Sequence, residues 1–153
     1  MLQRIQSVFM ILSTVAIALT IVLPLGHFDN NGIQFTMTAM GLKSSEGVTV
    51  PSVNHYMFIA PLIVAGLVTL KGIFNYKNRA GQLRDIRLSF LMLAIGMVLM
   101  AMYVNSAQTA QAESKFHFGM AFFLPIVALV FNWLAAKNIR KDEALVRSVD
   151  RIR

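Results

Sequence analysis

The chain has 153 residues, of which 56% are hydrophobic and 14% are charged, and it contains no cysteine. Its mean hydropathy is +0.62. It holds several uninterrupted apolar stretches of about twenty residues, the length that crosses a hydrocarbon core of roughly 30 Å, and this excludes an ordinary soluble domain. The formal net charge of +7 would favour nucleic acid as the partner of a soluble protein. Here the charge lies beside apolar segments, so we expect the lipid bilayer and no nucleic acid as the partner.

Four segments have the length and hydropathy of membrane spans, at about residues 5–25, 56–74, 88–104 and 118–136. None carries a charge near its middle, and a soluble four-helix bundle would need a polar face on each helix, which these segments lack. The first segment has a longer apolar core than a typical signal peptide and no cleavage site of the small-x-small type follows it, so we interpret it as a retained anchor. The sequence therefore predicts an all-α membrane protein, a single integral domain of four transmembrane helices.

The basic residues predict the orientation of the chain. Twelve of the fourteen lie on one side of the expected spans, and only Lys43 and Lys115 lie on the other. By the positive-inside rule, both termini and the loop at 75–87 are expected to be cytoplasmic, with loops 27–53 and 105–117 outside. The twelve are Arg4, Lys71, Lys77, Arg79, Arg84, Arg87, Lys137, Arg140, Lys141, Arg147, Arg151 and Arg153.

The first outer loop has a pattern of its own. Asp-Asn-Asn-Gly at 29–32 is typical of a turn, Ile33, Phe35 and Met37 alternate with polar residues, and GVTV at 47–50 repeats the period of two. We expect a small outward β-hairpin with strands at 33–38 and 47–50, its apolar side resting on the ends of the helices. The second outer loop is short and polar, and we expect it to have no fold of its own.

Three histidines are the candidate metal ligands. His27, His55 and His117 all fall at the outer membrane boundary, and three imidazoles at one depth can close on a divalent metal. The competing interpretation is that histidine, like the aromatic residues beside it, simply favours an interface. No HxxH or HxxxH pair fixes two of these ligands on one helical face.

Other kinds of site are disfavoured. None of the seven acidic residues lies in an expected span, which argues against a proton-coupled exporter, and the lack of cysteine excludes a membrane thiol oxidoreductase. The hydroxyl side chains in the spans form no evident pair of nucleophile and base. We expect no enzymatic activity and no cofactor.

The tail at 137–153 predicts an amphipathic helix over 139–153. At 100° per residue, Leu145, Val149 and Ile152 share one stripe, and Arg147 and Arg151 lie on the opposite one. Acids at 143 and 150 lie three or four residues from arginines, which favours an ordered helix over a disordered phosphate-binding arm. We expect these five residues to form a partner-binding surface, with the apolar stripe buried and the basic side facing water and headgroups.

A family resemblance covers the whole chain and is most specific at its ends. The opening MLQRIQSVF and the closing IRKDEALVRSVDRIR resemble an uncharacterised family, a domain of unknown function found in short four-span inner-membrane proteins of the Bacteroidota. The resemblance implies a multi-pass protein of the bacterial inner membrane. It implies no activity, cofactor or catalytic residue.

Two hypotheses for function follow. In the first, the protein is a non-enzymatic accessory subunit, or an assembly or scaffold factor, that binds other membrane proteins of a larger complex. In the second, it is a small transporter or sensor that holds a metal or another ligand through the three histidines. Homo-oligomerisation is compatible with either hypothesis.

Overall fold

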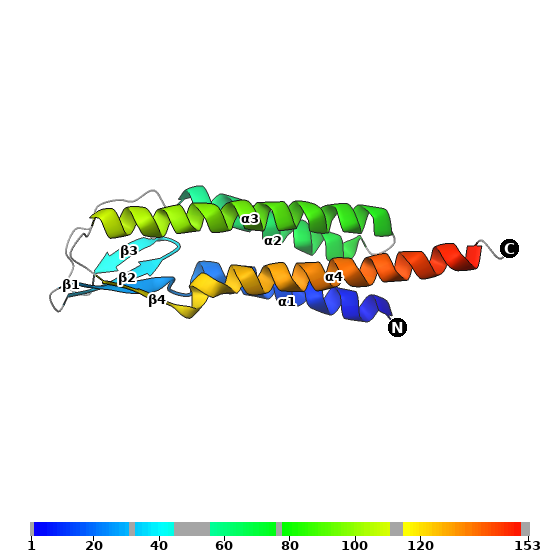
Figure 1. The fold of residues 1–153 in the computed structure, drawn as a ribbon, viewed down its shortest axis with the longest axis horizontal. Coiled ribbons are helices and arrows are strands. Elements are labelled where there is room, and N and C mark those ends of the chain that lie inside the picture. The colour runs from blue at the N-terminus through cyan, green and yellow to red at the C-terminus, as the bar shows by residue number, and fades with distance from the viewer. Residues whose placement is uncertain (1, 31–32, 45–55, 76–77, 111–114, 151–153) are drawn as a thin grey trace.

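The computed structural model describes residues 2–30, 33–44, 56–75, 78–110 and 115–150. The chain forms four long helices and one small antiparallel sheet. The helices are α1 (Leu2–Val22), α2 (Tyr56–Phe74), α3 (Arg79–Ala110) and α4 (Met120–Asp150). The strands are β1 (Gly26–Asn30), β2 (Ile33–Thr38), β3 (Gly41–Ser44) and β4 (Lys115–Phe118). The sheet lies at one end of the helices and both termini lie toward the other, which we call the sheet end and the tail end (Figure 1).

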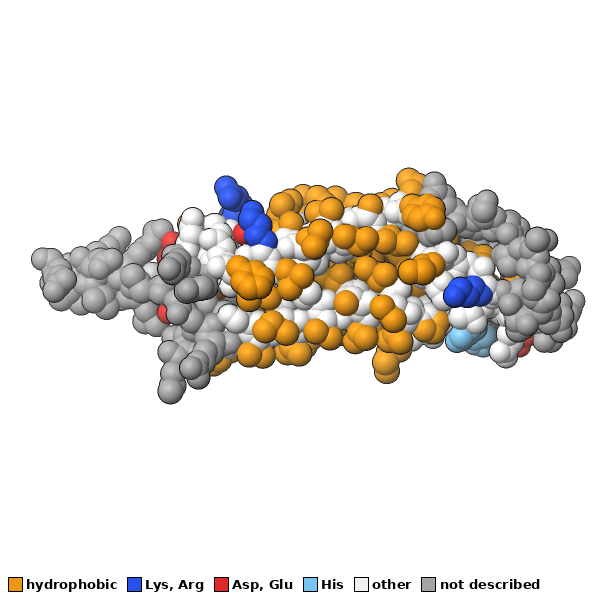
Figure 2. All heavy atoms as spheres, turned by 180° about the vertical axis from the view of Figure 1, so that it is seen from behind, with side chains coloured by type: hydrophobic (Ala, Val, Ile, Leu, Met, Phe, Trp, Pro, Cys, Tyr) orange, Lys and Arg blue, Asp and Glu red, His pale blue; other side chains and the backbone are white. Residues whose placement is uncertain are grey.

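The prediction of four apolar helices is confirmed. Each contains a stretch with a mean hydropathy of 1.8 to 2.2 that is long enough to cross a membrane, and only 28 to 33% of the residues in each stretch are buried. The outward surface is therefore itself apolar, and Figure 2 shows a belt of hydrophobic side chains, with charged and histidine side chains only toward the two ends. So large an apolar surface fits contact with lipid and not with water. The fold is that of a multi-pass membrane protein.

The helices pack as two antiparallel pairs, α2 on α3 and α1 on α4, and further contacts join α1 to α2 and α3 to α4. Small residues at the contacts allow the helices to approach closely, as is usual where lipid provides no hydrophobic driving force. For example, Ser13 of α1 donates a hydrogen bond of 3.1 Å to the Ala128 carbonyl oxygen of α4. The buried residues of α4 recur every three or four positions along its length: Ala121, Pro125, Ala128, Asn132, Ala135 and Ile139.

The sheet has the strand order β3-β2-β1-β4, and all its neighbours are antiparallel. Phe28 of β1 lies opposite Phe35 of β2 and Phe116 of β4. Residues directly opposite each other on neighbouring strands point to the same face of the sheet, so these three aromatic residues share one face. Phe28, Phe35 and Met37 are buried, and they belong to the same core as the last turns of α3. α3 is 32 residues long, about 48 Å, so it continues past the other helices along the sheet (Figure 1).

The strands differ from the expected hairpin. β2 has the bounds expected for the first strand, but it pairs with β3 at 41–44, and the expected second strand at 47–50 lies outside the described residues. Gly41 has a φ of 122°, which favours glycine and allows the chain to turn directly after β2. The prediction that residues 105–117 have no fold of their own was wrong, because α3 continues to Ala110 and β4 begins at Lys115.

Two helices are longer than the expected spans. α3 begins at Arg79, so most of the stretch 75–87 that was expected to be a loop is helical. α4 is one continuous helix from Met120 to Asp150, where the sequence predicts a span followed by an amphipathic tail helix. At the tail end, α4 extends past the start of α1 and past the connection between α2 and α3 (Figure 1). The last turns of α4 therefore form a helical projection that begins after Ile139, the last buried residue of α4 in the part that the structure describes.

Candidate functional site

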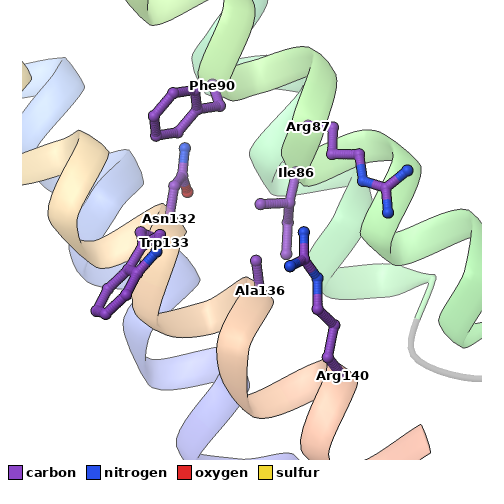
Figure 3. Close-up of a pocket in the computed structure, with 7 residues that line it drawn as sticks. All are labelled: Ile86, Arg87, Phe90, Asn132, Trp133, Ala136 and Arg140. Atoms are coloured by element: carbon purple, nitrogen blue, oxygen red, sulfur yellow. The ribbon is translucent and has the colours of Figure 1, made fainter.

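A groove between α3 and α4 at the tail end combines apolar and charged side chains. It has a volume of about 300 Å³. Figure 3 shows its seven lining residues, with Arg140 reaching from α4 toward α3. They are Ile86, Arg87, Phe90, Asn132, Trp133, Ala136 and Arg140. Two smaller hollows share Trp133 with it and extend the groove to Lys137 in one direction and to Leu129 and Val130 in the other.

Helical spacing brings these side chains together. Ile86 and Phe90 lie one turn apart on α3, as Trp133 and Lys137 do on α4, so each pair lies on one face of its helix. The Lys137 ammonium group lies 5.3 Å from the centre of the Trp133 ring, within the range of a cation–π interaction. Tryptophan and long basic side chains are typical of the boundary between hydrocarbon and headgroups. The groove therefore begins at this boundary and runs into the apolar belt.

Buried hydrogen bonds hold the wall of the groove. Asn132 of α4 is fully buried, and its Nδ2 donates to the Ser89 hydroxyl of α3 at 3.0 Å. That hydroxyl lies 2.7 Å from the Thr69 hydroxyl of α2, which donates to the Ala65 carbonyl oxygen at 2.8 Å. In membrane interiors each such bond contributes only about 0.6 kcal/mol, but together these bonds join three helices. They fix the position of α3 relative to α4 beside the groove.

A buried carboxylate lies next to the groove, on the α2 side of α3. Asp85 is only 3% exposed, and its Oδ1 lies 3.6 Å from Nζ of Lys71, which is itself exposed. The neighbouring Gln82 is also buried and donates to the Gly72 carbonyl oxygen at 3.1 Å. Asp85 lies within the apolar stretch Ala80–Thr109. The expected span at 88–104 begins after Asp85, so this acid was not counted as lying in a span, and its partner is a lysine at the end of α2.

Sequence reasoning missed Asp85 because it began the third span where the charges stop. The signal that could have found it is helical spacing, since Gln82, Asp85, Ser89 and Leu93 recur every three or four residues and are all buried. This ion pair compensates the charge of Asp85 through Oδ1, while Oδ2 has no hydrogen-bond partner among the described residues. It does not by itself provide a path for protons or ions.

Two of the three predicted metal ligands come together. His27 of β1 and His117 of β4 lie directly opposite each other in the sheet, on the face away from the helices. They line a hollow with Asp29 and Gln34, and His27 Nδ1 lies 3.3 Å from the Thr36 hydroxyl. His55 lies outside the described residues. Among the residues that the structure does describe, no three histidine or acidic side chains are grouped closely enough to hold a metal.

The predicted partner-binding residues lie at the end of α4. The backbone of Leu145, Arg147 and Val149 is helical, and their side chains are outside the described part of the structure. Arg151 and Ile152 follow the last described residue. The structure thus places three of the five on the helical projection.

Comparison with known proteins gives a family and no activity. No curated protein matches this chain. Residues 2–152 match the family described as a domain of unknown function, DUF4293. Because the match covers nearly the whole chain, the protein belongs to the DUF4293 family.

Proposed function

We propose that the protein is a non-enzymatic accessory subunit or assembly factor of a larger membrane complex, which it binds through the end of α4. The observation that carries this proposal is the helical projection, which extends beyond every other element at the tail end (Figure 1). Among the side chains that the structure describes, Ile139 is the last of α4 that belongs to a core cluster. The backbone of α4 continues as helix to Asp150, past the other described helices.

The sequence of the projection fits this role. Leu145, Val149 and Ile152 are predicted to share one stripe, and an apolar stripe on a helix surrounded by water is stabilised when a partner covers it. The cost of nucleation makes short isolated helices marginally stable in water. The projection continues a membrane-anchored helix, so it does not need a nucleation step of its own. It can therefore present a preformed surface to a partner.

The interior supports a role without chemistry. Its serine and threonine hydroxyl groups bond to backbone or to each other: Thr20 donates to the Ala16 carbonyl oxygen at 2.9 Å, and Thr69 and Ser89 bond as described above. Groups used in this way serve packing and helix association. The buried Tyr103 hydroxyl has no hydrogen-bond partner among the described residues. Homo-oligomerisation remains compatible with this role.

We further propose that the protein resides in the inner membrane of a bacterium of the Bacteroidota, with both termini in the cytoplasm. Six basic residues whose side chains the structure describes lie at the tail end: Lys71, Arg84, Arg87, Lys137, Arg140 and Lys141. At the sheet end, the described basic side chain is Lys43. This asymmetry supports a cytoplasmic tail end and a sheet on the outer surface.

Reporter fusions test the orientation. A reporter that is active only outside the cytoplasm should be active when it is fused after Lys43 and inactive when it is fused after Arg153, and a cytoplasmic reporter should show the reverse. The asymmetry of basic residues gives the direction. Activity of one reporter at both positions would contradict the proposed orientation.

A second experiment, which we call the tail test, measures whether the end of α4 binds a partner protein. The triple variant Leu145→Ser, Val149→Ser and Ile152→Ser should lose the partner that co-purifies with the wild-type protein in mild detergent, because it removes the apolar stripe. The double variant Arg147→Gln and Arg151→Gln should retain most of the binding, because exposed charges contribute about 0 to 1 kcal/mol each. Quantitative mass spectrometry of the purified complexes gives the comparison. Loss of the partner from the arginine variant alone would indicate an electrostatic arm instead.

The histidines favour a second candidate, an outer-surface sensor or transporter component. Residues directly opposite each other in a sheet have Cβ atoms about 5 Å apart, close enough for His27 and His117 to share one metal. We expect His27→Ala and His117→Ala each to weaken Zn²⁺ binding by about 10-fold or more, as measured by calorimetry on the purified protein. Lys43→Ala is the matched control, because Lys43 lies in the same row across the sheet. Equal Zn²⁺ affinity in all three variants would remove this candidate.

A further inference from the structure

We propose that the groove between α3 and α4 binds one anionic phospholipid, with its phosphate between Arg87 and Arg140 and an acyl chain along Phe90, Leu129 and Val130. This inference is independent of the proposed partner binding, because it concerns the wall of the bundle and not the projection. It rests on the charges at the mouth of the groove, on the apolar lining and on the length of the groove.

The two arginine side chains at the mouth of the groove favour the binding of an anion. Arg87 comes from α3 and Arg140 from α4, and both line the same hollow (Figure 3). Neither forms an ion pair with an acid among the described residues, and the nearby carboxylate of Asp85 is paired with Lys71. Two guanidinium groups at one site repel each other unless an anion lies between them, and their planar forks match the oxygens of a phosphate.

The lining below the mouth is apolar and faces the hydrocarbon. Phe90, Leu129, Val130 and Trp133 form the deeper part of the groove. All four lie in the stretches of α3 and α4 that can cross a membrane. A soluble phosphate would gain nothing from these side chains, whereas an acyl chain buries apolar surface against them.

The length of the groove matches one leaflet. Arg140 and Val130 are ten residues apart on α4, which is about 15 Å at 1.5 Å per residue. That is half of a hydrocarbon core of roughly 30 Å. The groove therefore runs from the headgroups to about the centre of the bilayer, the depth that one phospholipid occupies.

A hydrogen bond between α3 and α4 also fixes the distance between the two walls of the groove. Asn132 and Ser89 join its two walls by a hydrogen bond of 3.0 Å. The Lys137 ammonium group is held over the Trp133 ring at the rim, where it adds a third positive charge. A fixed width and three basic groups distinguish this position from the rest of the lipid-facing surface.

The protein carries its own reporter for the test, because Trp133 is the single tryptophan of the chain and lines the groove. The full-length protein is placed in vesicles of phosphatidylcholine, and phosphatidylglycerol or phosphatidylcholine with brominated acyl chains is added to quench the fluorescence of Trp133. We expect brominated phosphatidylglycerol to quench at a concentration about 25-fold lower, since each of the two arginines that flank the phosphate contributes about a fivefold preference for an anionic lipid.

Paired variants separate the groove from general attraction to the basic end. The variant Arg87→Gln with Arg140→Gln should lose most of the 25-fold preference, and Arg87→Lys with Arg140→Lys should keep part of it. The matched control is Arg84→Gln with Lys141→Gln, which removes two exposed charges at the same end that do not line the groove. The control should keep the preference, and circular dichroism shows that each variant is folded.

Four results would overturn the proposal. They are equal quenching by the two lipids in the wild type, loss of the preference in the control variant, displacement of the lipid by inorganic phosphate alone, and a Trp133 signal that depends on protein concentration. The third would indicate a site for free phosphate, and the fourth would indicate that a second copy of the chain covers the groove. Loss of the partner in the tail test leaves this quenching experiment unchanged, so the two proposals fail separately.

Discussion

Replacing Phe28 with alanine is expected to destabilise the protein by about 3 to 5 kcal/mol, the usual range for removing a phenylalanine side chain from a core. Phe28 is fully buried, and its ring centre lies 4.7 Å from that of Phe116. It lies on the face of the sheet that packs on the helices, in the same core as Met37 and Tyr103. The substitution leaves a cavity where the sheet meets the end of α3, so the sheet should separate from the helices before the helices separate from each other.

Phe118→Ala is the matched control, because Phe118 lies on β4 of the same sheet and is 55% exposed. We expect it to cost well under half as much as Phe28→Ala. Unfolding of both variants in mild detergent, followed by circular dichroism, gives the comparison. Equal destabilisation by the two substitutions would mean that the sheet does not pack on α3 as described.

The helices could be predicted because the signal is local. An apolar run of about twenty residues identifies a span without any knowledge of its neighbours, and the expected span at 56–74 has the bounds of α2. Hydropathy reports where a helix is apolar and not where it ends. α3 therefore begins nine residues before the expected span at 88, because the stretch 79–87 carries four charged residues but is still helical.

The sheet could be predicted only in part because most of its pairing is not local. The alternation at 33–38 is visible in the sequence, and β2 has those bounds. β1 pairs with β4, which follows it by more than eighty residues, and no local pattern in Gly26–Asn30 indicates that partner. The Asp-Asn pair that is typical of a turn also lies at the end of β1, where it concealed the strand.

The candidate groove could not be predicted from the sequence for the same reason, because its two walls come from helices that are far apart in the chain. The sequence assigned Arg87 to a loop and Arg140 to the tail, and it used both only as evidence for orientation. Their meeting depends on how α3 packs on α4, which the buried bond between Asn132 and Ser89 fixes. The sequence does show an asparagine, Asn132, in an apolar segment, and such a polar residue indicates that two helices meet there.

The largest effect of a single added methyl group is expected at Gly26. A Cβ atom at this position would lie 2.5 Å from the His117 carbonyl oxygen and would overlap the ring of Phe116. Backbone and a rigid ring cannot move aside cheaply, so Gly26→Ala should cost about 3 kcal/mol, the upper end of the usual range for overpacking. The strain acts on the pairing of β1 with β4. Thermal unfolding in mild detergent measures the loss of stability.

Gly66→Ala is the matched control, and its expected effect has the opposite sign. Its added Cβ would meet only Ile17 Cγ2, at an ordinary 3.6 Å, and alanine is favoured over glycine within a helix by about 1 kcal/mol. The two variants therefore add the same atom and differ only in what surrounds it. Gly26→Ala should also weaken the proposed Zn²⁺ binding by His27 and His117, while the proposed partner binding by the projection of α4 at the opposite end should be unchanged. If Gly26→Ala abolished partner binding and left the sheet intact, the two ends of the molecule would be coupled in a way that this packing does not provide.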